Sequence, residues 1–389
     1  MKGSVKRRGS RWYAIVDLDR ENGKRQQKYV RLERQITTKK KADVELNRII
    51  TELNSGEFVP PSNLTVSKLL TEHWLPHAKT TVGGKTYQRY QEIVKKKLVP
   101  AFGKTQAGKL QPGQVQQSYD AWLNSGLSAQ TVKHHHAVLR NAMRYGVRMG
   151  LVVRNVTDRV KPPALKSAEM LCLDEKQSLH LLREVKGTDL ESIVTVALFS
   201  GLRRSELLGL RWKDVDVAES TLTVRQGLQE TRGDLQPGKR YRPTVLEFKE
   251  PKTTKSRRTI TLDASVMASL KRHKAKQNSI RLRLEGGYAE DLDLVFCADD
   301  GKPLKPDTVS KQFAAAVKRV EIPYIRFHDL RHSHATQLLR AGVHFKIVSE
   351  RLGHASVAIT LDRYSHVLPG MDRTAADALA RLYEEARSA

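Results

Sequence analysis

The sequence is poor in cysteine and has no long apolar run. Cys172 and Cys297 are the only two cysteines among 389 residues, and they lie far apart. They suggest neither a disulfide framework nor a zinc knuckle, so we expect a reducing compartment, the cytoplasm. No stretch approaches the roughly 18 apolar residues of a membrane helix, so no membrane partner is expected. The basic start, Met1 to Arg8, lacks the apolar core of a signal peptide.

Acidic residues are also scarce. The chain holds 42 Asp and Glu against 69 Lys and Arg, which gives a formal net charge of +27. An enzyme for small molecules rarely carries such a field, because it attracts any polyanion. Nucleic acid is therefore the expected partner, whether the chain is an enzyme or only a structural nucleic-acid binder. Hydrophobic residues reach 39%, which is enough for the cores of two or three domains.

Basic charge is densest in the first two-fifths of the chain. Residues 1–50 hold 15 Lys and Arg against 6 acidic residues, and residues 64–160 hold 15 against 4. Residues 165–389 hold 38 against 30 over a much longer stretch, so their excess is diluted. Contacts to a nucleic-acid backbone are therefore predicted to concentrate in the first two segments.

The first 57 residues are predicted to form a small α+β domain. Trp12–Leu18 and Lys28–Leu32 are rich in aromatic and β-branched residues, and Asn22-Gly23 lies between them. Asn-Gly favours a type I′ hairpin turn, because both central residues of that turn need positive φ. A helix follows, with Thr38 as its expected cap and Gly56 at its expected end.

Residues 63–160 are predicted to form an all-α bundle of four helices. Pro60-Pro61 holds an extended linker before them. The expected helix starts are Thr65, Lys85, Pro112 and Ser128, with apolar residues at helical spacing. The second helix is expected to stop at Pro100. The basic residues expected on the exposed faces are Lys95, Lys96, Lys97, Lys133, Arg140, Arg144 and Arg148.

Residues 165–389 are predicted to be mainly α, with some β structure. Lys161-Pro162-Pro163 marks the linker before this segment. Helices are expected after Asp174, over Ile193–Phe199, Thr308–Val320, Asp329–Arg340 and Val343–Leu352, and near Thr374–Ala386. The β-prone runs contain Leu222, Val224, Val245, Phe248, Ile260 and Leu262.

Five short motifs in this last segment carry the residue types needed to attack a phosphodiester. They are Gly201-Leu202-Arg203-Arg204-Ser205-Glu206, Pro251-Lys252-Thr253-Thr254-Lys255, His328-Asp329-Leu330-Arg331, Leu352-Gly353-His354 and a lone Tyr364. Arginines bind phosphate oxygens, lysine and histidine move protons, and a tyrosine hydroxyl can become a covalent nucleophile. Glu206 lies one turn after Arg203 and could brace its guanidinium.

Charge alone does not select the acting residue in two of the motifs. Arg203 and Arg204 are equally basic, and each could be an ordinary arginine at a helix start. Lys252, Lys255, Arg257 and Arg258 share one tract, expected at the tip of a β-hairpin. That tract could equally be a basic loop that contacts phosphates.

In their order and context, these motifs resemble those of the tyrosine recombinases, the phage integrase family, across about the last 220 residues. The resemblance selects Arg203 over Arg204 and Lys252 over the other cations of its tract. The six implied catalytic residues are Arg203, Lys252, His328, Arg331, His354 and Tyr364.

The resemblance also implies a role for each of these groups. Tyr364 attacks the scissile phosphate, forms a 3′-phosphotyrosyl bond and releases a 5′ hydroxyl. Both arginines and His354 stabilise the charged transition state. Lys252 is the general acid and His328 a proton-transfer partner. No metal or other cofactor is implied, and the absence of a Walker loop agrees with chemistry that needs no ATP.

The resemblance implies a protein of three domains that acts on double-stranded DNA. Residues 1–57 resemble an arm-binding domain, residues 63–160 a core-binding domain and residues 165–389 the catalytic domain. A homotetramer on core and arm sites, helped by an excisionase or host DNA-bending proteins, would integrate a phage or conjugative element. The nucleoid of a bacterial host is the implied location.

Three other readings compete with this one. His328 and His332 stand four apart, as in a zinc-protease helix, but Asp329 replaces the expected glutamate and a strong cation lies between them. A type IB topoisomerase shares the tyrosine chemistry, and the N-terminal basic segments favour an integrase over it. An inactive DNA-binding regulator is disfavoured, because all six residues of the set are present.

Overall fold

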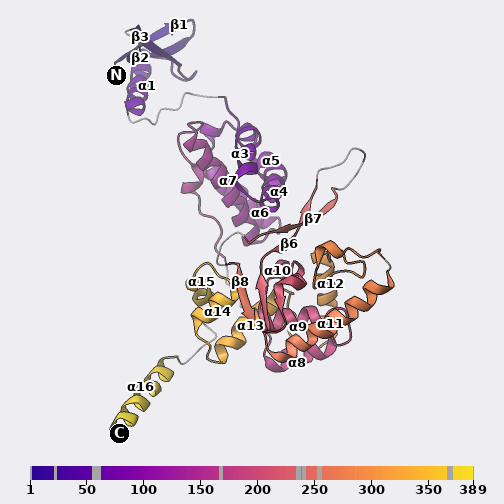
Figure 1. Cartoon of the computed structure of the whole chain (residues 1–389). Helices are drawn as coiled ribbons and strands as arrows, with labels where there is room; N and C mark the ends of the chain where they lie inside the picture. Colours follow the sequence, from indigo (N-terminus) through magenta and orange to yellow (C-terminus); the bar gives the residue numbers. More distant parts are fainter. Residues whose placement is uncertain are drawn as a thin grey trace. The chain divides into compact units, whose positions relative to one another are not determined.

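In the computed structural model the chain forms two compact units, Met1–Ser167 and Ala168–Ala389 (Figure 1). The structure describes residues 2–21, 24–54, 63–165, 170–233, 238, 242–251, 256–284, 286–365 and 371–388. No helix in these ranges is long and apolar enough to cross a bilayer. The first unit contains two separate apolar clusters, one before residue 50 and one after residue 65. The predicted boundaries of three domains stay a prediction.

The N-terminal cluster joins a three-stranded antiparallel sheet to one helix. The elements are β1 (Gly3–Arg8), β2 (Arg11–Glu21), β3 (Lys24–Arg31) and α1 (Lys39–Asn54). Strand β2 lies between the other two and buries Ala14 and Val16 against Ala42 and Ile49 of the helix. The strand pair β2–β3 and the helix were expected, whereas β1 was not, because its mostly exposed basic residues show no apolar alternation. The predicted turn at Asn22-Gly23 lies outside the described residues.

The second cluster of this unit belongs to the helical segment. Its main helices are α2 (Val66–Lys68), α3 (Leu75–Thr81), α4 (Gly84–Ile93), α5 (Val99–Phe102), α6 (Pro112–Asn124) and α7 (Ala129–Arg148). Thr65 and Ser128 cap helix starts through their hydroxyls, as expected. Helical structure does not end at Pro100, however. A π-helical turn over Val94–Leu98 leads directly into α5, whose first turn accommodates the proline.

The second unit is mainly helical. Its helices are α8 (Glu175–Glu184), α9 (Glu191–Ser200), α10 (Arg204–Leu208), α11 (Ala264–Arg283), α12 (Pro306–Val317), α13 (Asp329–Arg340), α14 (Phe345–Leu352), α15 (Val357–Tyr364) and α16 (Met371–Ser388). Asp174 caps α8 by accepting from the Gln177 N–H, as expected. Helices α11 and α15 were not predicted. Only the first half of α11 buries apolar residues, and α15 is a short helix.

The strands of this unit form two small sheets. Strands β4 (Val215–Asp216), β5 (Thr221–Val224) and β8 (Arg258–Thr261) make one, and β6 (Gly227–Arg232) and β7 (Thr244–Lys249) make the other. All their pairings are antiparallel. The expected β-hairpin with the basic tract at its tip is therefore wrong, since the strands before and after the tract, β7 and β8, pair with different partners. The residues from Lys252 to Lys255 lie outside the described residues.

Three histidines are buried on α13 and in the turn after α14. His332, His334 and His354 are 6%, 5% and 8% exposed. His334 contacts the Leu198 carbonyl through Nδ1, and its Nε2 accepts from Arg351. Burial, reinforced by nearby arginines, lowers the pKa of His334 and of His354 to about 3. Burial also lowers the pKa of His332 to about 4, so all three rings are neutral near pH 7.

Acidification from pH 7 to pH 5 should therefore loosen α13. An unfolded histidine takes up a proton near pH 6.5, whereas these folded ones do not. The unfolded state thus binds more protons below pH 6.5, and the free energy of unfolding falls by about 1–2 kcal/mol per histidine at pH 5. Hydrogen–deuterium exchange of residues 329–340, corrected for intrinsic rates, measures this loss in the full chain.

Two substitutions test the source of the effect. His334→Gln should weaken the pH dependence, because one buried titrating ring is gone. His180→Gln, at an exposed histidine, should leave it unchanged. An opening free energy for α13 that stays constant between pH 7 and pH 5 would contradict the prediction.

Candidate active site

Arg203 occupies the turn between two helices of the second unit. Helix α9 ends at Gly201, whose φ of 64° lies in the left-handed region. A Cβ at this position would lie 2.5 Å from Cδ2 of His334, so only glycine fits without a rearrangement. Arg203 then adopts an extended conformation just before α10 begins. The chain therefore reverses sharply at Gly201 and presents the Arg203 side chain beside the start of α10.

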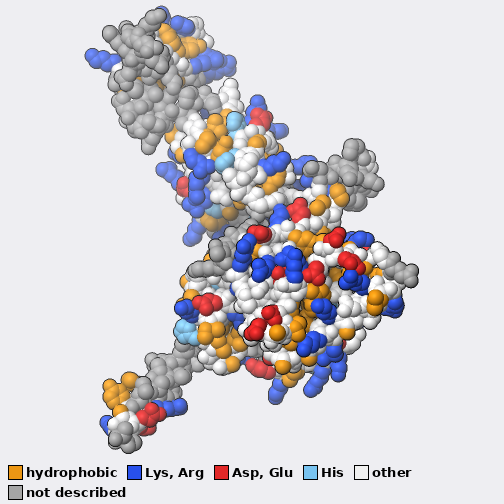
Figure 2. Space-filling model, viewed as in Figure 1, with side chains coloured by type: hydrophobic (Ala, Val, Ile, Leu, Met, Phe, Trp, Pro, Cys, Tyr) orange, Lys and Arg blue, Asp and Glu red, His pale blue; other side chains and the backbone are white. Residues whose placement is uncertain are grey.

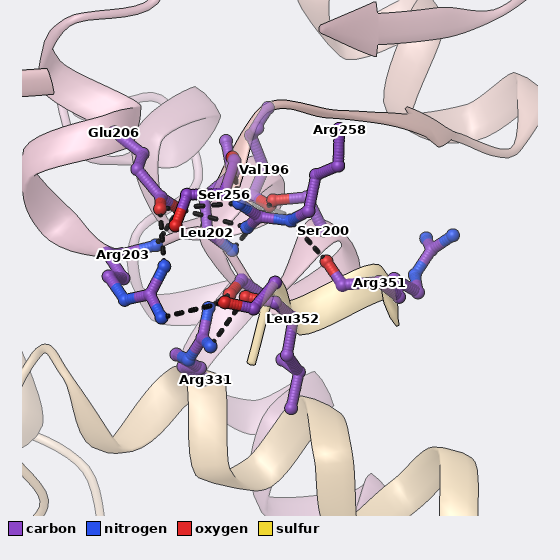
Figure 3. Close-up of polar contacts among 12 residues, drawn as sticks. Val196, Ser200, Leu202, Arg203, Glu206, Ser256, Arg258, Arg331, Arg351 and Leu352 are labelled. Carbon is purple, nitrogen blue, oxygen red and sulfur yellow. Dashed lines mark hydrogen bonds and ion pairs between the residues drawn. The ribbon is translucent and has the colours of Figure 1, made fainter. Parts of the chain in front are cut away.

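Glu206 binds two arginines from different parts of the fold (Figure 3). Nη1 of Arg203 donates to Oε1 of Glu206 at 2.6 Å, and the Arg203 backbone N–H donates to Oε2 at 2.9 Å. From β8, Nη2 of Arg258 donates to Oε2 at 2.9 Å. Burial alone raises the pKa of Glu206, but the two arginines outweigh it and leave that pKa below its ordinary value. Glu206 is therefore a buried carboxylate anion.

Arg331 is held by backbone carbonyls rather than by a carboxylate. It is 3% exposed and lies on α13. Its Nη1 donates to the Gly201 carbonyl at 2.8 Å, and its Nη2 donates to the Leu352 carbonyl at 2.7 Å. Burial and then the nearby charge of Arg203 lower the pKa of Arg331 to about 9, which leaves it charged at neutral pH. The helix ends at Gly201 and Leu352 thus fix the direction of its guanidinium.

The turn after α14 joins this network. Gly353 has a φ of 66° and ends the helix, and its carbonyl accepts from Nη2 of Arg203 at 3.2 Å. His354 follows at once, and its Nδ1 lies 2.8 Å from Oγ1 of the buried Thr360. Three residues predicted for the site, Arg203, Arg331 and His354, are therefore brought to one turn.

Tyr364 is fully buried at the end of α15. Its ring packs with Ala335, Leu339, Val348 and Leu352. Its Oη lies 2.7 Å from Nδ1 of His332. Burial raises the pKa of Tyr364 to about 12, so the hydroxyl is protonated in this state. An attack by this oxygen requires that the proton be removed.

His328 and Lys252 complete the predicted set. His328 is exposed at the start of α13, and its ring packs perpendicular to the ring of His332, with centroids 5.4 Å apart. Lys252 lies outside the described residues, so its predicted role stays a prediction. The zinc reading of His328 and His332 gains no support, because the described part of the chain contains no group of three or more residues arranged to hold a metal.

Sequence reasoning missed two residues of this site, Arg258 and His332. Arg258 was one of several cations in a basic tract, although strand alternation with the buried Ile260 could have indicated that its side chain points inward. His332 lies four residues after His328, on the same face of a helix. From the sequence, that spacing suggests only a possible zinc site.

Comparisons with known proteins agree with these motifs. The sequence matches the profile of the phage integrase family over residues 172–370 and that of the phage integrase N-terminal SAM-like domain over residues 68–123. It is 26% identical to a tyrosine recombinase XerC-like protein of Caldanaerobacter subterraneus subsp. tengcongensis, over 98% of this chain and 99% of that protein. It is also 26% identical to the ICEBs1 integrase of Bacillus subtilis, over 75% and 77% of the two chains.

Solved structures share the fold. An integrase of the Tn1549 transposon, in complex with a circular intermediate DNA, matches with a TM-score of 0.67 at 18% identity, over 81% of this chain and 99% of that chain. Lambda integrase, as a tetramer bound to a Holliday junction, matches with a TM-score of 0.59 at 18% identity, over 90% and 92%. Since the family profile spans half of the sequence and the fold agrees, the chain belongs to the phage integrase family.

Proposed function

We propose that this protein is a site-specific DNA recombinase, an integrase that cuts and rejoins DNA through a 3′-phosphotyrosyl intermediate. The observation that carries the proposal is the pair of arginines fixed around the turn at Leu352 and Gly353, in a fold whose α15 ends with a buried tyrosine. Family membership supports the reaction class. The ICEBs1 and Tn1549 integrases are named for mobile elements, and we propose that this chain serves such an element.

The arginine network is suited to an anion that carries its charge on oxygen. The network contains three positive charges, on Arg203, Arg258 and Arg331, and one negative charge, on Glu206. Its net charge is therefore positive. Carbonyl contacts occupy two of the five N–H donors of Arg331, so other donors remain for a phosphate. Together with His354, the two predicted arginines would stabilise the charge that develops on the non-bridging oxygens.

The covalent step uses Tyr364 as the nucleophile. Its Oη gives up the phenolic proton and bonds to phosphorus, the bond from phosphorus to the 5′ oxygen breaks, and that oxygen takes a proton from Lys252. His328 would help to move protons at the exposed side. The phosphotyrosyl ester keeps the energy of the broken bond, so rejoining needs no ATP. The guanidiniums supply the charge stabilisation that a metal ion provides in other phosphoryl-transfer sites, so we propose a metal-independent reaction.

The first unit would hold the DNA duplex. Six of the seven basic residues expected on its helical surface are exposed, including Lys95, Lys133 and Arg144, whereas Lys97 is half-buried. Figure 2 shows Lys and Arg outnumbering Asp and Glu on the visible face of this unit. Lambda integrase forms a tetramer on a Holliday junction, and we propose the same assembly here on core and arm sites. An excisionase or host DNA-bending proteins would bias the direction. A type IB topoisomerase is the second candidate, but no observation favours it.

Tyr364→Phe should abolish cleavage and leave DNA binding nearly intact, because only one hydroxyl is lost. A nicked suicide substrate traps the covalent protein–DNA adduct, which gel electrophoresis detects. Tyr383→Phe, at an exposed tyrosine of α16, is the matched control and should form the adduct normally, with or without EDTA. An adduct formed by the Tyr364 variant would disprove the nucleophile assignment.

Lys252→Ala should slow cleavage about 10²–10⁴-fold, the usual contribution of a general acid. A substrate with a 5′-phosphorothiolate leaving group should restore the rate, since a thiolate leaves without a proton. Lys255→Ala is the matched control and should need no such rescue. If Arg331→Ala is rescued to the same extent as the Lys252 variant, then Lys252 is not the acid.

Deletion of residues 1–57, which carry a net charge of +7, should separate two DNA-binding activities. The shortened protein should cleave a core suicide substrate but lose most integration between attachment sites. The comparison needs one fixed ionic strength, because phosphate contacts weaken with salt. The full chain with Lys6→Gln and Arg7→Gln, both exposed on β1, tests whether charge alone carries the effect. Unchanged integration by the deletion variant would contradict the arm-binding role and would mean that the N-terminal segment is only a basic appendage.

A further inference from the structure

His332 is the histidine that touches the proposed nucleophile. It lies on α13 between Arg331 and the buried Ser333, and it is 6% exposed. Its Nδ1 lies 2.7 Å from Oη of Tyr364, a distance typical of a strong hydrogen bond. The two rings are tilted at 51°, with centroids 5.8 Å apart. The contact joins residues 32 positions apart in sequence.

The chemistry of both groups gives this hydrogen bond a direction. Burial keeps the His332 imidazole neutral and the Tyr364 phenol protonated at neutral pH. A neutral imidazole has one N–H and one lone pair, and a phenol is a good donor. The consistent arrangement is donation from Oη to the Nδ1 lone pair, with the ring proton of His332 on Nε2. The tyrosine proton therefore already points at a base.

The other buried histidines of the second unit have different partners. Nδ1 of His354 contacts Oγ1 of Thr360, and Nδ1 of His334 contacts the Leu198 carbonyl. His328 packs its ring against the ring of His332 rather than against Tyr364. Within the described residues, His332 is thus the histidine hydrogen-bonded to the tyrosine. His328 is exposed and contacts only the ring of His332 in this pair.

We propose that His332 is a catalytic residue that orients the Tyr364 hydroxyl and receives its proton as Oη bonds to phosphorus. This inference rests on the proposed function. In the step, the O–P bond forms, the bond to the 5′ oxygen breaks, and the phenolic proton moves to Nδ1 of His332. Rejoining reverses it: the 5′ hydroxyl attacks, and His332 returns the proton to Tyr364.

Substrate binding favours the transfer. Burial is the main cause of the weak basicity of His332, and the charges of His328, Arg363 and Arg331 add to it, partly offset by Asp329. A phosphate bound beside Arg331 counters part of this repulsion, so the basicity of His332 rises when DNA arrives. The proton also leaves in concert with bond formation, because an oxygen esterified to phosphorus cannot keep it.

Two substitutions distinguish the two functions proposed for His332, which are to accept a hydrogen bond from the Tyr364 hydroxyl and to receive its proton. His332→Asn places an amide oxygen near the position of Nδ1, so it can accept a hydrogen bond but cannot take the proton. His332→Ala removes both functions. On the 5′-phosphorothiolate suicide substrate, where no general acid is needed, we expect both full-length variants to form adduct about 10²–10⁴-fold more slowly than the wild type. Lys252→Ala should be fast on this same substrate.

Added imidazole provides a readout that a packing role would not change. It should accelerate adduct formation by the His332→Ala variant, with larger gains from more basic imidazoles. His334→Ala, at a buried histidine without contact to Tyr364, is the matched control and should show no acceleration. Thermal unfolding and DNA binding of each variant establish that slow cleavage does not reflect misfolding.

The wild-type protein offers a test that needs no variant. Nitrogen NMR of labelled histidine should show an unprotonated Nδ1 and a protonated Nε2 at His332. A proton on Nδ1 would overturn the proposal, and so would wild-type cleavage by the His332→Asn variant. The proposal would also be overturned if imidazole did not accelerate adduct formation by a His332→Ala variant that folds and binds DNA. If the wild type itself forms no adduct, the proposed function fails, whatever His332 does.

Discussion

The carboxylate of Glu206 is the interaction on which the arginine network depends. A buried charge without partners is costly, so this group requires cations that remain in place. Arg203 binds it from the turn before α10, and Arg258 binds it from β8. One carboxylate therefore fixes a helical segment against a strand of the sheet. Loss of Glu206 would leave the two guanidiniums to repel each other in a partly buried space.

Backbone carbonyls complete the support without cancelling charge. Two helices end on glycines in the left-handed region, Gly201 and Gly353, and both of their carbonyls accept from arginines of the site. Leu352 adds a third carbonyl, which accepts from Arg331. A carbonyl satisfies a guanidinium N–H but carries no net charge, so the positive charge of the site persists. The geometry is thus set before an anion arrives, which limits the reorganisation needed during a reaction.

The parts of the fold that could be predicted have local signals. Asp174 caps α8, and Glu206 braces Arg203 one turn away, as their spacing indicated. The partners of Arg258 and His332 could not be predicted in this way, because they lie 52 and 32 residues away in sequence. A basic tract indicates that cations are present, but pairing of β8 with β5 decides which of them turns inward. Strand β1 escaped prediction for a similar reason, since its exposed, basic surface shows no apolar alternation.

The close approach of Arg258 to Gly353 constrains how this sequence can change over evolutionary time. A Cβ on Gly353 would lie 2.9 Å from Nη1 of Arg258, and Nε of the same arginine donates to the Arg351 carbonyl. The glycine is therefore required by a neighbouring strand as well as by the end of its own helix. Substitutions at the two positions are therefore coupled. If a smaller residue replaces Arg258, the steric constraint from β8 on Gly353 is lost, and only the left-handed backbone at the end of α14 still favours glycine there.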